Sequence, residues 1–208
     1  MKKMSIQEFV SESNIEIIQG LMNANNGYIT TKVITELGIH RMYLNIMKNK
    51  GLIESVGNGV YLDSTKIKDD YFILNLETQN MIYSHMTALY FHQLSIKAPD
   101  RKYDISIPNN YHNEKLKQHN IFYIPKKWYT LGLTEVETPH GNKVRVYDIE
   151  RCICDIIRSK NRMDIEHIKY SVKEYLKRKD KDLVKLSIYA DKMKIKEEVM
   201  NLISMIYE

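Results

Sequence analysis

The stretch Thr30–Leu62, TTKVITELGIHRMYLNIMKNKGLIESVGNGVYL, carries the strongest structural signal in the chain. Thr30 or Thr31 can cap a short helix, because a side-chain hydroxyl accepts a hydrogen bond from a free N–H of the first turn. Gly38 then ends that helix, since glycine tolerates the left-handed backbone that commonly terminates one. The pattern predicts a short helix followed by a tight turn.

A second helix is predicted directly after this turn. It begins at His40 and ends at Gly51, and its apolar Leu44 and Met47 are three residues apart, so they share one face. An earlier helix, over about residues 15–25, is expected to form a third wall of the same core through Ile17, Ile18, Leu21 and Met22.

Two short strands follow the second helix, at Leu52–Val56 and Val60–Leu62. The residues between them, Gly57-Asn58-Gly59, strongly indicate a hairpin because Gly and Asn accept positive φ. Helices, turn and hairpin in this order are typical of a winged helix-turn-helix. We expect such a domain over residues 1–65.

The outward face of the second helix predicts double-stranded DNA as a partner. In a winged helix-turn-helix this face lies in the major groove, where Asn can read adenine and Arg can read guanine. The hairpin tip lies near a phosphate or the minor groove. The expected contact residues are Thr31, Arg41, Met42, Tyr43, Asn45, Lys48, Asn49, Lys50 and Asn58.

Charge supports this interpretation only in part. Residues 1–62 carry six basic and five acidic residues, a net charge of +1, whereas residues 38–62 carry three basic residues and one acidic residue. Winged helices also serve as protein-interaction or dimerisation modules, and that alternative stays open.

Composition sets further limits. A chain of 208 residues is long enough for two small domains, each with its own core. The net charge of +5 is compatible with nucleic acid without establishing it. The sequence has no apolar run of about 18 residues and no apolar signal-peptide core, so we expect a cytoplasmic protein.

The second domain is expected over residues 66–208, with a small, mainly antiparallel sheet and a helical bundle, which gives the chain an α+β fold. The expected helices are Asp70–Leu94, Ile149–Ser159, Ile165–Arg178, Leu183–Lys194 and Lys196–Ile206. The expected strands are Lys102–Pro108, Ile121–Ile124, Leu133–Thr138 and Lys143–Tyr147.

The sequence predicts neither a metal site nor a cofactor. Cys152 and Cys154, two apart in a helix, point about 200° apart, which suits neither a disulfide nor zinc and indicates buried side chains. His85 and His92 share a helix face but lack a third ligand, so histidines at the edge of the core are the better interpretation. No nucleophile elbow, phosphate-binding loop, zinc-protease motif or nucleotidyltransferase signature is present. We therefore expect a protein without catalytic activity.

Positive charge concentrates in Lys97–Lys127, with seven basic and three acidic residues. This segment could be a solvated surface, a second DNA contact or a surface for an acidic protein partner. The basic residues after Lys143 could extend it.

Three blocks of sequence together resemble antitoxins of the type IV abortive-infection (AbiE) toxin–antitoxin systems. The first block comprises Gly27-Tyr28, Gly38–Leu44, Gly51–Ile53 and Gly59–Tyr61. The second comprises Ser84–Leu89 and the Tyr103–Pro108 strand, and the third comprises Thr138-Pro139, Gly141-Asn142 and Val144–Arg151. The resemblance covers about residues 15–195.

The resemblance implies a bifunctional protein of a phage-defence operon. The winged helix would repress the operon promoter at inverted repeats, and the second domain would neutralise a nucleotidyltransferase-type toxin, directly or through a shared target. Because the residues of the second and third blocks look structural, we assign the antitoxin surface to exposed basic residues instead: Arg101, Lys102, Lys126, Lys127, Arg145, Arg151 and Arg158.

Two other functions stay open. The chain could be a plain regulator whose second domain binds an effector or dimerises. It could also be a nucleic-acid-processing enzyme, which would require carboxylates or histidines to converge near Lys102–Lys127.

Overall fold

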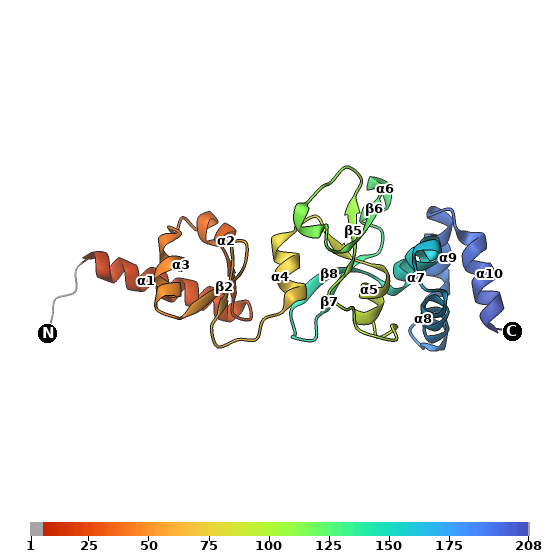
Figure 1. Ribbon diagram of the computed structural model, residues 1–208, viewed down its shortest axis with the longest axis horizontal. Helices are drawn as coiled ribbons and strands as arrows, with labels where there is room; N and C mark the ends of the chain where they lie inside the picture. Colours follow the sequence, from red (N-terminus) through yellow and green to blue (C-terminus); the bar gives the residue numbers. More distant parts are fainter. Residues whose placement is uncertain (1–5, 208) are drawn as a thin grey trace. The chain divides into compact units, whose positions relative to one another are not determined.

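Helices and a three-stranded sheet alternate in the N-terminal part of the chain. The computed structural model describes residues 6–207, so residues 1–5 of the expected first domain lie outside the described residues. The strands pair antiparallel in the order β1-β3-β2. The elements are α1 (Ile6–Ala24), β1 (Tyr28–Thr30), α2 (Thr31–Glu36), α3 (Met42–Asn49), β2 (Ile53–Gly57) and β3 (Val60–Asp63) (Figure 1).

The core of this part forms as the apolar spacing predicts. Ile18, Ile34, Leu44 and Met47 are almost completely buried in one cluster contributed by α1, α2 and α3. Ile17, expected in the core, is instead 47% exposed on the outer face of α1. It is one residue from Ile18, and neighbouring positions on a helix point in different directions.

The N-terminal unit extends further than residue 65, where the sequence placed the boundary. It continues to Gln79, includes α4 (Asp70–Glu77), and takes in the separate segment Pro139–Asn142. The Phe72 ring of α4 packs edge-on against Tyr28, and the Tyr28 hydroxyl accepts a hydrogen bond from the backbone N–H of Asp69 at 2.8 Å. These buried contacts place α4 with the first sheet.

The segment Pro139–Asn142 completes this unit through side-chain amides. The Asn142 amide donates a hydrogen bond to the Asp69 carboxylate at 2.8 Å, and the Asn26 amide donates to the Asn142 side-chain oxygen at 3.0 Å. Asn142 and Asp69 are both buried.

A five-stranded sheet and eight helical segments build the second unit, which within the described residues comprises Asn80–Thr138 and residues 143–207. Its strands are β4 (Ile82–Tyr83), β5 (Asp104–Pro108), β6 (Asn120–Ile124), β7 (Leu133–Glu137) and β8 (Lys143–Tyr147). Its first helical segments are α5 (His85–Phe91), the 3-10 turn η1 (Glu114–Leu116) and α6 (Lys126–Tyr129). The others are α7 (Ile149–Arg158), the 3-10 turn η2 (Lys160–Arg162), α8 (Ile165–Lys177), α9 (Leu183–Lys192) and α10 (Lys196–Tyr207).

The sheet of this unit is mixed rather than mainly antiparallel. Its strand order is β6-β5-β4-β8-β7, with parallel pairing of β5 with β6 and of β4 with β8. The connection between β5 and β6 contains η1 and returns the chain to the end of the sheet where β5 begins, because the two strands run parallel. Only the β4–β5 and β7–β8 pairs are antiparallel.

The expected helix Asp70–Leu94 is wrong. The structure divides this stretch into α4, the two-residue strand β4 and α5. Thr78 ends α4 with extended backbone, and His85 begins α5 with a φ of +46°. Pairing of β4 with both β5 and β8 stabilises this break, which no local pattern indicates.

Helix α7 is the central helix of the second unit. It contacts α5, α8, α9 and α10, and residues 150–157 are buried on every side. The four C-terminal helices lie close to their expected bounds (Figure 1). The described chain is a mixed α/β protein with two sheets, consistent with the expected α+β class. Within residues 6–207, no helix is long and apolar enough to span a membrane.

Candidate functional sites

The outer face of α3 gathers most of the residues expected to contact DNA. Leu44 and Met47 are buried against the core, whereas Asn45, Lys48 and Asn49 are exposed. Arg41, Met42 and Lys50, at the two ends of the helix, are exposed as well. The face is therefore polar and basic, with Met42 as its exposed apolar side chain.

Neighbouring side chains hold the N-terminal end of α3 in place. The His40 Nδ1 atom accepts a hydrogen bond from the backbone N–H of Met42 at 3.2 Å, which satisfies one free donor of the first turn. The Arg41 Nε atom donates to the Thr35 hydroxyl at 3.3 Å, and this hydroxyl donates to the Thr31 carbonyl at 2.8 Å. The guanidinium of Arg41 is thus oriented by α2.

Two of the expected contact residues are partly enclosed. Tyr43 is half-buried and packs against the core cluster. Thr31 donates its backbone N–H to the Gly59 carbonyl at 2.8 Å, and its hydroxyl lies so close that a Cβ on Gly59 would approach it to 2.5 Å. The side chain of Thr31 therefore supports the hairpin turn.

The tip of the β2–β3 hairpin lies against an acidic residue of α4. The Asn58 side chain is exposed as expected, but its backbone N–H donates to the Glu77 carboxylate. Gly57 allows this close approach, because a Cβ there would lie 2.9 Å from Glu77 Oε1 and 3.0 Å from the Ile73 side chain.

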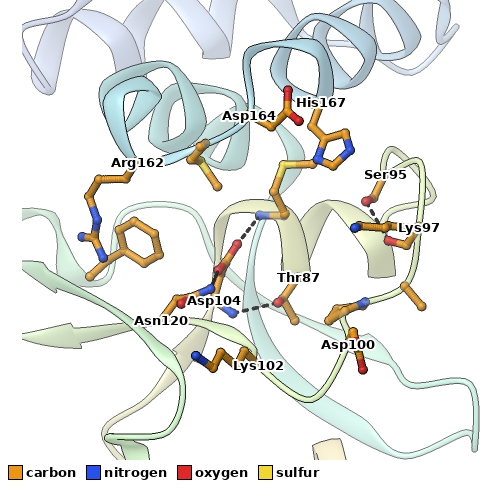
Figure 2. Close-up of a pocket in the computed structure, with 15 residues that line it drawn as sticks. Thr87, Ser95, Lys97, Asp100, Lys102, Asp104, Asn120, Arg162, Asp164 and His167 are labelled. Atoms are coloured by element: carbon orange, nitrogen blue, oxygen red, sulfur yellow. Dashed lines mark hydrogen bonds between the residues drawn. The ribbon is translucent and has the colours of Figure 1, made fainter.

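The second unit contains a cavity of about 370 Å³ between the start of β5, the start of β6 and the η2–α8 turn. Figure 2 shows Asp164 and His167 on one side of it and Asp100 and Lys102 on the other. Lys97 and Arg162 add two further cations. The walls of the cavity thus contain carboxylates and a histidine, and Lys102 lies across the cavity from Asp164 and His167.

Asp104 is the most buried carboxylate of this cavity. Its oxygens accept hydrogen bonds from the Asn120 amide at 2.9 Å and from the backbone N–H of Met86 at 3.0 Å. Burial raises the pKa of Asp104, and these hydrogen bonds oppose part of that rise. Because its two oxygens accept hydrogen bonds from β6 and α5, Asp104 holds these two elements together. Within residues 6–207, no group of three His, Cys, Asp or Glu side chains could hold a metal ion.

A second cavity, of about 320 Å³, shares Phe122 and Arg162 with the first and lies at the C-terminal end of α7. Its cations are Arg158 and Arg162. The Arg158 guanidinium stacks over Trp128 at 4.6 Å, and the Arg162 guanidinium over Phe122 at 4.2 Å.

His85 lies buried at the wall of the second cavity. Its Nε2 atom is 3.0 Å from the Ser159 hydroxyl, its Nδ1 atom is 2.9 Å from the Ser84 hydroxyl, and its ring stacks on Phe122. Burial lowers the pKa of His85 well below its ordinary value, and Arg151, Arg162 and Arg158 lower it further. An imidazole held neutral in this way is a weak base. The expected position at the edge of the core is correct for His92, which is half-buried and hydrogen-bonded to the Tyr147 carbonyl, whereas His85 lies fully inside.

The structure places the expected basic surface residues at several locations. Arg101, Lys102, Lys126, Lys127 and Arg158 are exposed, and Lys127 and Arg158 both lie over the Trp128 ring. Arg145 is half-buried, and burial lowers its pKa despite nearby Tyr129 and Glu135.

Arg151 was expected on this surface, and that expectation is wrong. Its side chain is fully buried and pairs with Asp155 at 3.1 Å. Its Nη1 atom donates to the carbonyls of Trp128 and Leu131, and its guanidinium lies over the Tyr147 ring. Although Arg151 and Arg158 are seven residues apart, α7 is enclosed along most of its length and emerges only at Arg158.

The third resemblance block is structural around Arg151, as the sequence indicated. Lys185 pairs with both Asp148 and Glu150, and the Tyr175 hydroxyl donates to Glu150. Both cysteines, Cys152 and Cys154, are free and buried, as expected. No sequence pattern indicated Ser159 or Tyr123 as cavity residues.

No protein-family model and no curated protein matches the chain. Among solved structures, the crystal structure of the RV2827C protein from Mycobacterium tuberculosis is similar, with a TM-score of 0.49 and 14% sequence identity. The match covers 94% of this chain and 81% of that chain. A similarity of this size implies nothing about function.

Proposed function

We propose that the N-terminal unit is a winged helix-turn-helix that binds double-stranded DNA, with α3 in the major groove and the β2–β3 hairpin as the wing. The single observation that carries the proposal is the two-sided character of α3. Its inner face is buried, while Asn45, Lys48 and Asn49 project from its outer face. Amide and cationic side chains on an exposed helix are suited to base edges and phosphates.

One short helix reads only a few base pairs. Two copies of the chain on an inverted repeat are therefore the economical arrangement, and we propose the promoter of the protein's own operon as that site. Repression follows from occupancy of the promoter.

The test is DNA binding by the full chain carrying Arg41→Ala, Asn45→Ala and Lys48→Ala. The triple variant should lose binding to the promoter fragment, while circular dichroism shows it folded. A matched control also removes two positive charges and one amide, but from α8 and α10: Lys169→Ala, Lys173→Ala and Asn201→Ala. If control and triple variant bind DNA equally, α3 is not the contact helix.

The second unit is proposed to neutralise a nucleotidyltransferase-type toxin, so that the chain is a type IV antitoxin as well as a repressor. The three-block sequence resemblance supports this role. The proposed surface consists of the exposed cations of the predicted set, without the buried Arg151 and the half-buried Arg145: Arg101, Lys102, Lys126, Lys127 and Arg158. Neutralisation could act on the toxin or on a target that both proteins share.

Growth of cells that express the neighbouring reading frame tests this role. The full chain and its α3 triple variant should both restore growth, whereas Lys126→Gln with Lys127→Gln should restore it less. Failure of the full chain to restore growth would favour the plain regulator. Metal-dependent turnover of nucleic acid by the purified chain would favour the enzyme.

A further inference from the structure

The chain contains two Asn-Gly pairs, Asn26-Gly27 and Asn58-Gly59, and both lie in the N-terminal unit. An asparagine followed by glycine is prone to spontaneous loss of its side-chain amide. Glycine has no Cβ to keep its backbone nitrogen away from the asparagine side chain, so this nitrogen can attack the amide carbon. In a folded protein the attack depends on how freely the side chain and the glycine N–H can move, and the two pairs differ in this respect.

Hydrogen bonds hold both reacting groups of the first pair. The Gly27 N–H donates to the Met22 carbonyl at 2.7 Å, and Gly27 is buried. The Asn26 amide donates to the Asn142 side-chain oxygen at 3.0 Å and to the Gly141 carbonyl at 3.3 Å. Attack at this pair therefore requires these bonds to open first.

The second pair, at the tip of the β2–β3 hairpin, has no such bonds at its reacting groups. The Asn58 side chain is exposed, and within residues 6–207 neither its amide nor the Gly59 N–H forms a hydrogen bond. The bonds of this pair involve other groups: the Asn58 N–H donates to the Glu77 carboxylate, and the Gly59 carbonyl accepts from the Thr31 N–H. The two groups that would react are thus available to each other.

We propose that Asn58 is a site of deamidation and that this change weakens DNA binding through the wing. The Gly59 nitrogen forms a bond to Asn58 Cγ and gives up its proton, and the side-chain nitrogen leaves with that proton as ammonia. Water then opens the resulting cyclic imide. Breakage of the Cγ–N bond leaves aspartate, whereas breakage of the bond between the backbone carbonyl carbon of residue 58 and the same nitrogen leaves isoaspartate.

Either product carries a carboxylate in place of a neutral amide. A side-chain carboxyl is ionised near pH 7, and this one lies at the same hairpin tip as Glu77. Isoaspartate also routes the main chain through Cβ, which lengthens the turn. The chemical change does not depend on DNA, whereas its effect on DNA binding rests on the proposed function.

Peptide mapping of the full-length protein tests the chemistry. During incubation in mildly alkaline buffer, tandem mass spectrometry should find conversion of amide to acid at Asn58 about tenfold or more faster than at Asn26, the scale of the hydrogen bonds that protect Asn26. In urea the two rates should become similar, because unfolding exposes both pairs. In the folded protein, a rate at Asn58 no higher than at Asn26 would overturn the proposal.

Binding of a labelled promoter fragment tests the consequence. Asn58→Asp should bind about two- to fivefold more weakly at low salt than Asn58→Gln, which keeps a neutral amide, the scale of a partly screened surface charge. Asn201→Asp makes the same charge change on α10 and should bind as the unaltered protein does.

Incubation separates the two parts of the proposal. The unaltered protein should lose affinity as residue 58 converts, whereas Asn58→Gln should keep its own affinity, because glutamine forms a larger imide ring and reacts far more slowly. Equal affinity of Asn58→Asp and Asn58→Gln would reject the effect on DNA. If freshly prepared protein failed to bind the fragment, the proposed function would be wrong, and the mass measurement would still decide whether Asn58 is modified.

Discussion

The carboxylate of Glu77 accepts a hydrogen bond from the backbone N–H of Asn58, so an acidic residue lies at the tip of the β2–β3 hairpin. A DNA phosphate would bind the same N–H, since phosphate and carboxylate oxygens are both anionic acceptors. In the proposed complex, Glu77 therefore opposes the contact that the wing would otherwise make.

Replacement of Glu77 by Gln should strengthen DNA binding. The variant removes one negative charge near the DNA phosphates of the proposed complex. It keeps a side-chain oxygen that can accept the hydrogen bond from the backbone N–H of Asn58. We expect an affinity increase of about two- to fivefold at low salt, the scale of a partly screened surface charge. Fluorescence anisotropy with a labelled promoter fragment measures it. Glu166→Gln, on α8, makes the same charge change in the other unit and should leave affinity unaltered.

DNA affinity should fall steeply with salt. A winged helix that contacts about five phosphates should give a log–log slope of about −4 to −5, because counterions are released on binding. Lys48→Ala should make this slope shallower by about one. A slope near zero would contradict an electrostatic contact through α3.

Arg151 should be required for stability of the second unit and not for contact with a partner. Burial lowers its pKa, but the Asp155 carboxylate more than offsets this, and the net shift is upward. Arg151→Met leaves Asp155 buried without its cation and should cost about 3–5 kcal/mol in the free energy of unfolding. Urea denaturation measures the loss.

Arg151→Met combined with Asp155→Leu removes both charges and should regain much of that stability. Arg158→Met, at the exposed end of the same helix, is the control and should cost less than about 1 kcal/mol. A double variant as unstable as the single variant would show that the pair is not the main contribution of Arg151.

Stability should decrease as the pH falls below about 6.5. Burial and then the three nearby arginines lower the pKa of His85, so the folded protein keeps this ring neutral while the unfolded chain protonates it. The unfolded state thus binds more protons in this range, and each such histidine costs up to about 1.4 kcal/mol per pH unit. His85→Asn should make the dependence shallower between pH 6.5 and pH 5, whereas His112→Asn, at an exposed position, should not. Burial also lowers the pKa of His92, so some dependence should remain.

The two thiols should resist alkylation in the folded protein. Cys152 and Cys154 are completely buried, and burial is the main cause that raises the pKa of each. Iodoacetamide reacts with an accessible thiolate. Because both thiols are buried in the folded protein, iodoacetamide should label them only at about the rate of global unfolding. Rapid labelling without denaturant would contradict the packing of α7.

Local signals predicted α2, α3 and the β2–β3 hairpin, but they indicated neither β1 nor the start of α1 at Ile6. Thr30 accepts from the backbone N–H of Val33 as a cap, and Gly38 adopts a φ of +71° where the helix was expected to end. The hairpin turn at Gly59, with a φ of +72°, is of the same kind. Each of these features depends on neighbours within a few residues, which a sequence shows directly.

Pairing between residues far apart in the chain could not be predicted from local sequence patterns. Ile82 and Tyr83 form a strand because they pair with β5 on one side and β8 on the other. Neither partner is a sequence neighbour of these two residues, so the local pattern predicts a helix there instead. The contact of Asn142 with Asp69 joins residues far apart in the chain and has no local signal.

Of the candidate sites, the sequence predicted the one that depends on local periodicity and not the one that depends on long-range contacts. The outer face of α3 followed from helical periodicity, because one side of that helix is buried. The same periodicity misplaced Arg151, since α7 has no free side until Arg158. The second cavity is lined by Tyr123 of β6, Ser159 at the C-terminal cap of α7 and Arg162 of η2, and no spacing along the chain relates these residues.

The N-terminal unit is completed by a segment that the ribosome makes late. Asn142, the buried partner of Asp69, emerges only after β4–β7 have been synthesised. At ordinary translation rates the delay after Gln79 is on the order of several seconds. During that interval the nascent first unit lacks one of its buried contacts, so its final closure has to wait for the chain that follows it.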